Sequence, residues 1–140
     1  MRIFLDANIL VSVLNKEYPL FTYSARIVSL VDNKRFTVCT SPVCLAIAFY
    51  FAEKKSGTKK AKQKIKLLAE KISITDVGKT EVLRALENPR INDFEDGIEH
   101  YAAVNNKCDV IVTEDTGDFY FADITVCRAQ NFLIEYCYMS

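Results

Sequence analysis

The chain has 140 residues, of which 50% are hydrophobic and 11% aromatic, so it can bury a core and is neither disordered nor a coiled coil. Its 18 lysines and arginines balance 18 aspartates and glutamates, which excludes a global charge that would attract nucleic acid or a membrane. The five cysteines form no Cys-x-x-Cys pair and are expected to be free, buried thiols of a reducing cytosol. The longest apolar run is about half of the roughly 20 residues that a membrane-spanning helix needs. We therefore expect one soluble, cytoplasmic domain over residues 1–140.

Short apolar runs alternate with segments of helical periodicity along the whole chain. The predicted strands are residues 2–5, 36–39, 72–74, 110–112 and 124–126. The predicted helices are residues 8–14, 21–31, 42–54, 58–71, 80–86, 93–104 and 129–136. Strands that alternate with helices imply βαβ units, and these predict an α/β fold with a parallel sheet covered on both faces.

The helix predicted at residues 42–54 is unusual because it is apolar almost all round. Ser41 and Pro42 supply a capping hydroxyl and a proline at its first turn. A helix without a polar face has to be buried on more than one side. Self-association into a dimer is one way to bury it.

Acidic residues follow two of the predicted strands. The first strand is followed at once by Asp6, and the strand at 110–112 is followed by Asp115 and Asp118. Ligands of parallel α/β sheets bind beyond the carboxyl ends of the strands. If the first and fourth strands are neighbours, Asp6 and Asp115 project into one crevice, to which the first turn of the helix predicted at residues 93–104 could add Asp96. Carboxylates gathered in this way repel one another unless a cation lies among them.

The type of donor indicates which ion such a site prefers. Oxygen ligands without imidazole or thiolate favour Mg²⁺ or Mn²⁺, and these ions typically activate water for attack on phosphate esters. His100 is the only histidine, which disfavours a zinc site built from several imidazoles and a nucleophile paired with histidine.

Three segments resemble the first, third and fourth motifs of the PIN domain family, and together they span nearly the whole chain: Ile3–Leu10, Asn92–Glu99 and Asp109–Phe119. The resemblance implies a three-layer α/β/α sandwich with a central parallel sheet. It also implies an endoribonuclease that depends on Mg²⁺ or Mn²⁺, often a VapC-type toxin that is paired with an antitoxin protein. The catalytic residues implied are Asp6, Asp96 and Asp115. Asp118 would join them as a metal ligand, with Asn8 and Thr113 in support.

The second motif of the family departs from its pattern in this chain. The family places a glutamate early in the helix after the second strand, in a run resembling Ser-Pro-x-x-x-x-Glu, and here Ile47 stands at that position. Glu53 lies six residues further on, about 240° around the helix and roughly 9 Å along it, so it is a poor substitute. Two classes of function therefore remain open. One is a metal-dependent ribonuclease, and the other is a catalytically weakened or inactive PIN-like module that binds RNA or a protein partner.

Each candidate ligand could instead have an ordinary structural role. Asp6 could cap the helix that follows it, because aspartate is a favoured N-cap residue. Asp93 and Asp96 lie three residues apart at a helix start, so we assign Asp93 to capping and keep Asp96 as a ligand. Asp115 and Asp118 lie in a loop where aspartate is common, and of the two we prefer Asp115 as the ligand.

A basic segment is the candidate RNA contact. Residues 54–71 hold eight lysines and a single acid. The lysines that we single out for RNA binding are Lys54, Lys55, Lys59 and Lys60. Such lysines either contact RNA phosphates along the rim of the acidic site or form a solvated helix face. The sequence is compatible with both interpretations.

Overall fold

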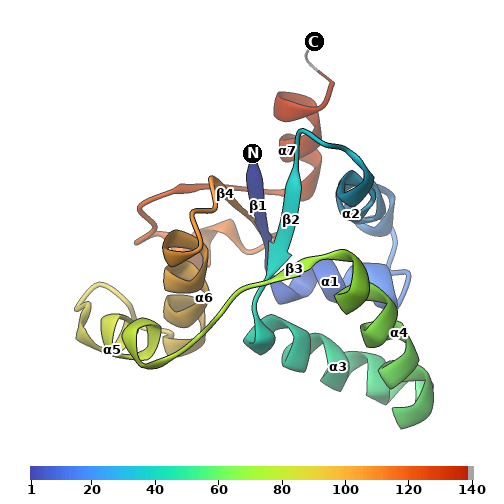
Figure 1. Ribbon diagram of the computed structural model, residues 1–140, viewed down its shortest axis with the longest axis horizontal. Helices are drawn as coiled ribbons and strands as arrows, with labels where there is room; N and C mark the ends of the chain where they lie inside the picture. Colours follow the sequence, from blue (N-terminus) through green and yellow to red (C-terminus); the bar gives the residue numbers. More distant parts are fainter. Residues whose placement is uncertain (139–140) are drawn as a thin grey trace.

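A five-stranded parallel sheet lies at the centre of the computed structural model, which describes residues 1–138, and helices flank it (Figure 1). The strands are β1 (Arg2–Leu5), β2 (Thr37–Thr40), β3 (Ser73–Ile74), β4 (Val110–Val112) and β5 (Thr125–Cys127). The α-helices are α1 (Ala7–Leu14), α2 (Phe21–Val28), α3 (Pro42–Ser56), α4 (Thr58–Lys71), α5 (Lys79–Glu87), α6 (Phe94–Asn105) and α7 (Ala129–Tyr136). Two 3₁₀-helices complete the described elements: η1 (Ser29–Asp32) and η2 (Thr116–Phe119). This architecture is the expected three-layer α/β/α sandwich.

The strand order is β3-β2-β1-β4-β5, and every pair is parallel. The central strand is β1, whose Phe4 pairs with Cys39 of β2 on one side and with Ile111 of β4 on the other. The chain moves outward from β1 through β2 to β3, and then crosses back to β4 on the opposite side of β1. The order therefore reverses between β1 and β4, which is where open parallel sheets bind their ligands.

The helices form connected layers around this sheet. Helix α1 contacts α2 and α3, α2 contacts α7, α3 contacts α4, and α5 contacts α6. Figure 1 shows α6 and α2 on opposite sides of the strands, with α3 crossing beyond their carboxyl ends. Phe4, Ile111 and Phe132 are fully buried between the layers. Because both faces are covered, β1 and β4 are continuous apolar runs rather than alternating ones.

Several elements differ in their bounds from the sequence prediction, most by one or two residues. The helix expected to reach residue 31 ends at Val28 and tightens into η1, where the Ser29 hydroxyl donates to the Ala25 carbonyl at 2.8 Å. The edge strand β3 has only two residues, because Ile72 caps the end of α4, its N–H donating to the Leu68 carbonyl at 3.1 Å. The other edge strand, β5, is shifted by one residue toward the C-terminus. Within residues 1–138, no helix is both long enough and apolar enough to cross a membrane.

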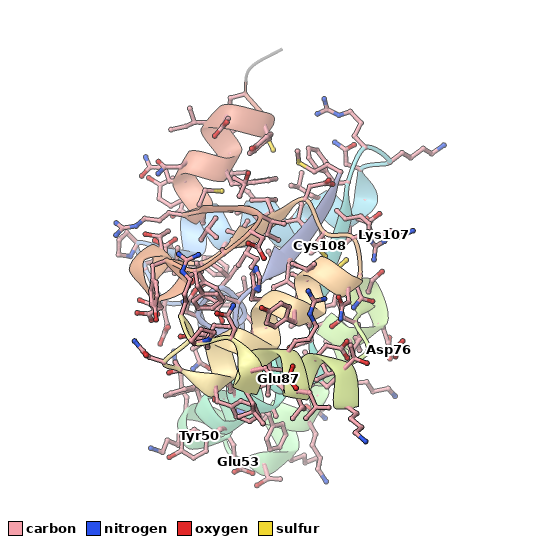
Figure 2. The ribbon with its side chains drawn as sticks, turned by 90° about the vertical axis from the view of Figure 1, so that its left-hand side faces the viewer. Tyr50, Glu53, Asp76, Glu87, Lys107 and Cys108 are labelled. Carbon is pink, nitrogen blue, oxygen red and sulfur yellow. The ribbon has the colours of Figure 1, made fainter. Side chains whose placement is uncertain are left out.

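The burial of α3 and of the cysteines is less complete than expected. In the single chain α3 buries one stripe, Cys44, Ala48 and Ala52, while Tyr50 and Phe51 are 52% and 45% exposed. Figure 2 shows Tyr50 at the surface of the lower end of the molecule. The cysteines are free, but Cys127 and Cys137 are only half-buried because they lie near the edge of the fold.

Candidate metal centre

Asp6 connects the central strand to the first helix and to the neighbouring strand. It follows β1 directly and caps α1, because its Oδ1 accepts a hydrogen bond of 2.6 Å from the backbone N–H of Ala7. The Thr113 hydroxyl, just beyond β4, donates to Oδ2 at 2.7 Å. The side chain is buried, at 7% exposure. The capping and site interpretations of Asp6 are therefore compatible, since one oxygen holds the helix and the other faces the sheet edge.

Asn8 ties the ends of β1 and β4 together. Its amide Nδ2 lies 3.2 Å from Asp6 Oδ2, 3.0 Å from Thr113 Oγ1 and 3.1 Å from Asp115 Oδ2. Its Oδ1 accepts from the backbone N–H of Glu114 at 3.2 Å, and Thr113 Oγ1 accepts from the N–H of Asp115 at 3.1 Å. Through these contacts Asn8 and Thr113 bring the carboxylates of Asp6 and Asp115 to one place.

A cavity of about 490 Å³ opens at this edge of the sheet. Its acidic lining comes from Asp6, Glu17, Asp93, Glu95, Asp96, Asp115 and Asp118. Its apolar lining includes Val11, Leu20, Ile47 and Phe51. The four aspartates predicted as ligands thus lie on one cavity, together with the isoleucine that stands in the place of the family's second acid.

The charge of the cavity is concentrated at the start of α6. Asp93 caps this helix, as the sequence predicts, by accepting from the N–H groups of Glu95 and Asp96 at 2.9 and 3.2 Å. Burial, followed by the negative charges of Asp93, Asp6 and Asp118, raises the pKa of Asp96 to about 7. A carboxyl group that resists ionisation among other acids is typical of a site that accepts a cation.

Glu53 and His100 lie away from this chemistry. Glu53 lies in the last turn of α3, where its carboxylate accepts a hydrogen bond of 2.9 Å from the Thr58 hydroxyl, and Figure 2 shows it at the lower end of the molecule. His100 is fully buried, and its Nε2 accepts from the backbone N–H of Asp123 at 3.0 Å. Neither residue lines the acidic cavity.

The four lysines singled out for RNA binding do not line the cavity either. The Lys54 ammonium lies 4.6 Å from the centre of the Tyr50 ring. The Lys55 ammonium donates to the carbonyl of Asn15 at the end of α1, so this lysine also caps a helix. Lys59 and Lys60 are exposed on α4. RNA binding by these residues stays a prediction.

Sequence reasoning missed two buried residues beside Asp6. The Cys44 thiol of α3 donates to Glu99 Oε1 of α6 at 3.2 Å, and Glu99 is only 1% exposed. One ligand atom each from Asp6, Cys44 and Glu99 lie within 4.8 Å of one another. Burial, and next the Asp6 carboxylate, raises the pKa of Glu99 to about 10. The available signal was spacing, because Glu99 follows Asp96 by three residues and shares its helix face.

A three-layer parallel fold with acids at the reversal point between β1 and β4 defines the class of protein. The chain belongs to the PIN domain family, whose family model matches residues 2–117.

Relatives of known structure or function agree with this assignment. The chain is 27% identical to Ribonuclease VapC1 of Aquifex aeolicus (strain VF5) over 135 residues, which cover 94% of this chain and 92% of the relative. The fold is similar to VapBC2 from Rickettsia felis, solved with a promoter DNA fragment, at a TM-score of 0.69, 18% identity, and 91% and 98% coverage of the two chains. It is also similar to VapC20 of Mycobacterium tuberculosis, described as a sarcin-ricin loop cleaving toxin, at a TM-score of 0.68, 18% identity, and 88% and 96% coverage.

Proposed function

We propose that this protein is a Mg²⁺- or Mn²⁺-dependent endoribonuclease that hydrolyses RNA phosphodiester bonds. The observation that carries the proposal is the convergence of Asp6, Asp96, Asp115 and Asp118 on one cavity at the reversal point of a PIN fold. The similarity to Ribonuclease VapC1 supports the same reaction class.

The donors on the cavity fit a hard divalent ion. Carboxylate oxygens from Asp6, Asp96 and Asp115 would hold it, with Asp118 beside them, and these are the ligands that Mg²⁺ and Mn²⁺ prefer. A bound ion would lower the pKa of water for attack on the phosphodiester and stabilise the leaving oxygen.

The chain's own polar groups prepare the site for this task. Asn8 and Thr113 are uncharged, and their hydrogen bonds hold the Asp6 and Asp115 carboxylates in place. Binding of an ion would therefore not have to pay the entropic cost of ordering these two side chains. Val11, Leu20 and Phe51 form an apolar part of the cavity wall.

The proposal includes the partners of a toxin. We infer an antitoxin protein as partner, because the similar solved structures include VapBC pairs and FitAB. We also infer a homodimer through α3, whose exposed Tyr50 and Phe51 leave an apolar face without cover in the single chain. RNA would meet the cavity, with Lys59 and Lys60 as further contacts to phosphate.

A second function is favoured by Ile47, which lines the cavity where the family carries a glutamate. One carboxylate fewer weakens the hold on a cation, so the chain could serve as a non-catalytic PIN module that binds RNA or protein. The variant Ile47→Glu separates the two. RNA cleavage that arises only in the variant supports the non-catalytic module, whereas cleavage by the natural chain refutes it.

Titration of the protein with Mn²⁺ by calorimetry tests the main proposal. The natural chain is expected to bind Mn²⁺, and Asp6→Asn is expected to lose binding, because this aspartate contributes the most buried carboxylate of the predicted set. The control is Asp76→Asn, an exposed aspartate outside the cavity that Figure 2 labels. RNA cleavage then has to follow the same order among the three proteins. A natural chain that neither binds Mn²⁺ nor cleaves RNA would refute the proposed function.

A further inference from the structure

Glu99 is an acid to which the motifs of the family give no role. It lies on α6, three residues after Asp96, and its side chain is almost completely buried, at 1% exposure. A buried glutamate either stays protonated, as the raised pKa of Glu99 indicates for the metal-free protein, or has its charge compensated by a cation or several donors. Glu99 does not line the acidic cavity itself, but one of its carboxylate oxygens lies within 4.8 Å of a carboxylate oxygen of Asp6, which does.

The protein supplies a partner for only one of the two carboxylate oxygens. The Cys44 thiol donates to Oε1 at 3.2 Å. Among the described residues, no hydrogen-bonding group reaches Oε2. The thiol therefore helps to fix the orientation of the carboxyl group, and the second oxygen is left without a partner among the described residues.

The Glu99 carboxylate belongs to a group of side chains with nearly the spacing of a coordination shell. The ligand atoms of Asp6, Cys44 and Glu99 all lie within 4.8 Å of one another. Two oxygens that share one Mg²⁺ lie at most about 4.2 Å apart, because each metal–oxygen distance is about 2.1 Å. A shift of about 1 Å or less in the side chains brings the Asp6 and Glu99 carboxylates to that separation.

We propose that Glu99 is a ligand of the metal ion and that it replaces, from α6, the glutamate that the PIN family carries on α3 where this chain has Ile47. Cys44 is a positioning residue that holds the Glu99 carboxylate toward Asp6. The site therefore keeps its number of carboxylates although the second motif has lost its acid. This inference rests on the proposed metal-dependent function and names a ligand for it.

Mn²⁺ calorimetry combined with thermal unfolding of Glu99→Gln tests the inference without any activity assay. We expect the dissociation constant for Mn²⁺ to rise at least about tenfold, because a carboxylate ligand is lost. We expect the melting temperature of the metal-free variant to equal or exceed that of the natural chain, because glutamine removes a buried, poorly compensated acid. A purely structural glutamate would give the opposite pattern, with lower stability and unchanged affinity per folded molecule.

A matched control and a rescue variant sharpen the test. Glu95→Gln makes the same substitution one turn earlier on α6, at an exposed residue of the cavity rim, and should weaken Mn²⁺ binding at most about threefold. The double variant Glu99→Gln with Ile47→Glu returns a carboxylate to α3 and should recover most of the lost affinity. Cys44→Ser keeps a donor to Glu99 Oε1 and should bind Mn²⁺ more tightly than Cys44→Ala.

The outcomes separate this inference from the function on which it rests. If the natural chain binds Mn²⁺ and Asp6→Asn does not, but Glu99→Gln binds as tightly as the natural chain, the role of Glu99 is refuted and the proposed function stands. A double variant no better than Glu99→Gln alone would also overturn the replacement of the α3 acid. If the natural chain does not bind the ion at all, both ideas fall.

Discussion

Replacement of Asn8 by alanine tests how the candidate site is held together. The change removes the amide that contacts Asp6 Oδ2, Thr113 Oγ1 and Asp115 Oδ2, and the oxygen that accepts from the N–H of Glu114. A hydrogen bond to a charged group contributes about 1.5–3 kcal/mol and one between neutral groups about 1 kcal/mol. The contact with exposed Asp115 adds little because water screens it. We expect the free energy of unfolding to fall by about 2–3 kcal/mol.

The loss of Asn8 should also affect the ion, because Asp115 loses the side chain that holds it beside Asp6. We expect the dissociation constant for Mn²⁺ to rise about tenfold in Asn8→Ala. Urea unfolding of the metal-free protein measures the first effect, and calorimetry measures the second. Asn131→Ala, an exposed asparagine on α7, serves as the control and should change stability by less than about 0.5 kcal/mol. An Asn8→Ala protein with unchanged stability and unchanged affinity would show that the amide does not organise the site.

Three further predictions concern capping, protonation and RNA. Ser41→Ala should lower the free energy of unfolding by about 1 kcal/mol in urea, because the Ser41 hydroxyl accepts from the N–H of Cys44 at the start of α3; an unchanged midpoint would exclude the cap. Burial lowers the pKa of His100 below its ordinary value of 6.5. As the pH falls below 6.5, this histidine therefore becomes protonated in the unfolded chain before it does so in the folded chain, and the folded state loses stability. Stability should therefore fall between about pH 7 and pH 5 more in the natural chain than in His100→Gln, and parallel curves would contradict this. If Lys59 and Lys60 contact phosphates, changing both to glutamine should lower the slope of log K against log salt for single-stranded RNA by about 0.7 per lost contact; an unaltered slope would assign them to a solvated face.

The element order could be predicted from the sequence because each element carries a local signal. The strand at residues 110–112 and the helices at 58–71 and 129–136 agree with the structure to the residue. The misplaced boundaries lie where local signals are weak. The two-residue edge strand β3 makes few ladder bonds, and the end of α2 depends on a serine that bonds back to its own helix.

In the candidate site, too, the residues with a local sequence signal could be predicted and the others could not. Asp6 and Asp115 could be placed because each follows a strand, and the rule for parallel sheets brings strand ends together without further information. The contact between Cys44 and Glu99 depends on how α3 packs against α6. No local sequence pattern in either helix predicts that packing. Comparison of the second motif alone with the family pattern therefore shows only Ile47 where a glutamate is expected. If Glu99 is a ligand as proposed, α6 supplies the carboxylate that α3 lacks, so metal binding by this chain should be judged from the acids that surround Asp6 in space rather than from the second motif alone.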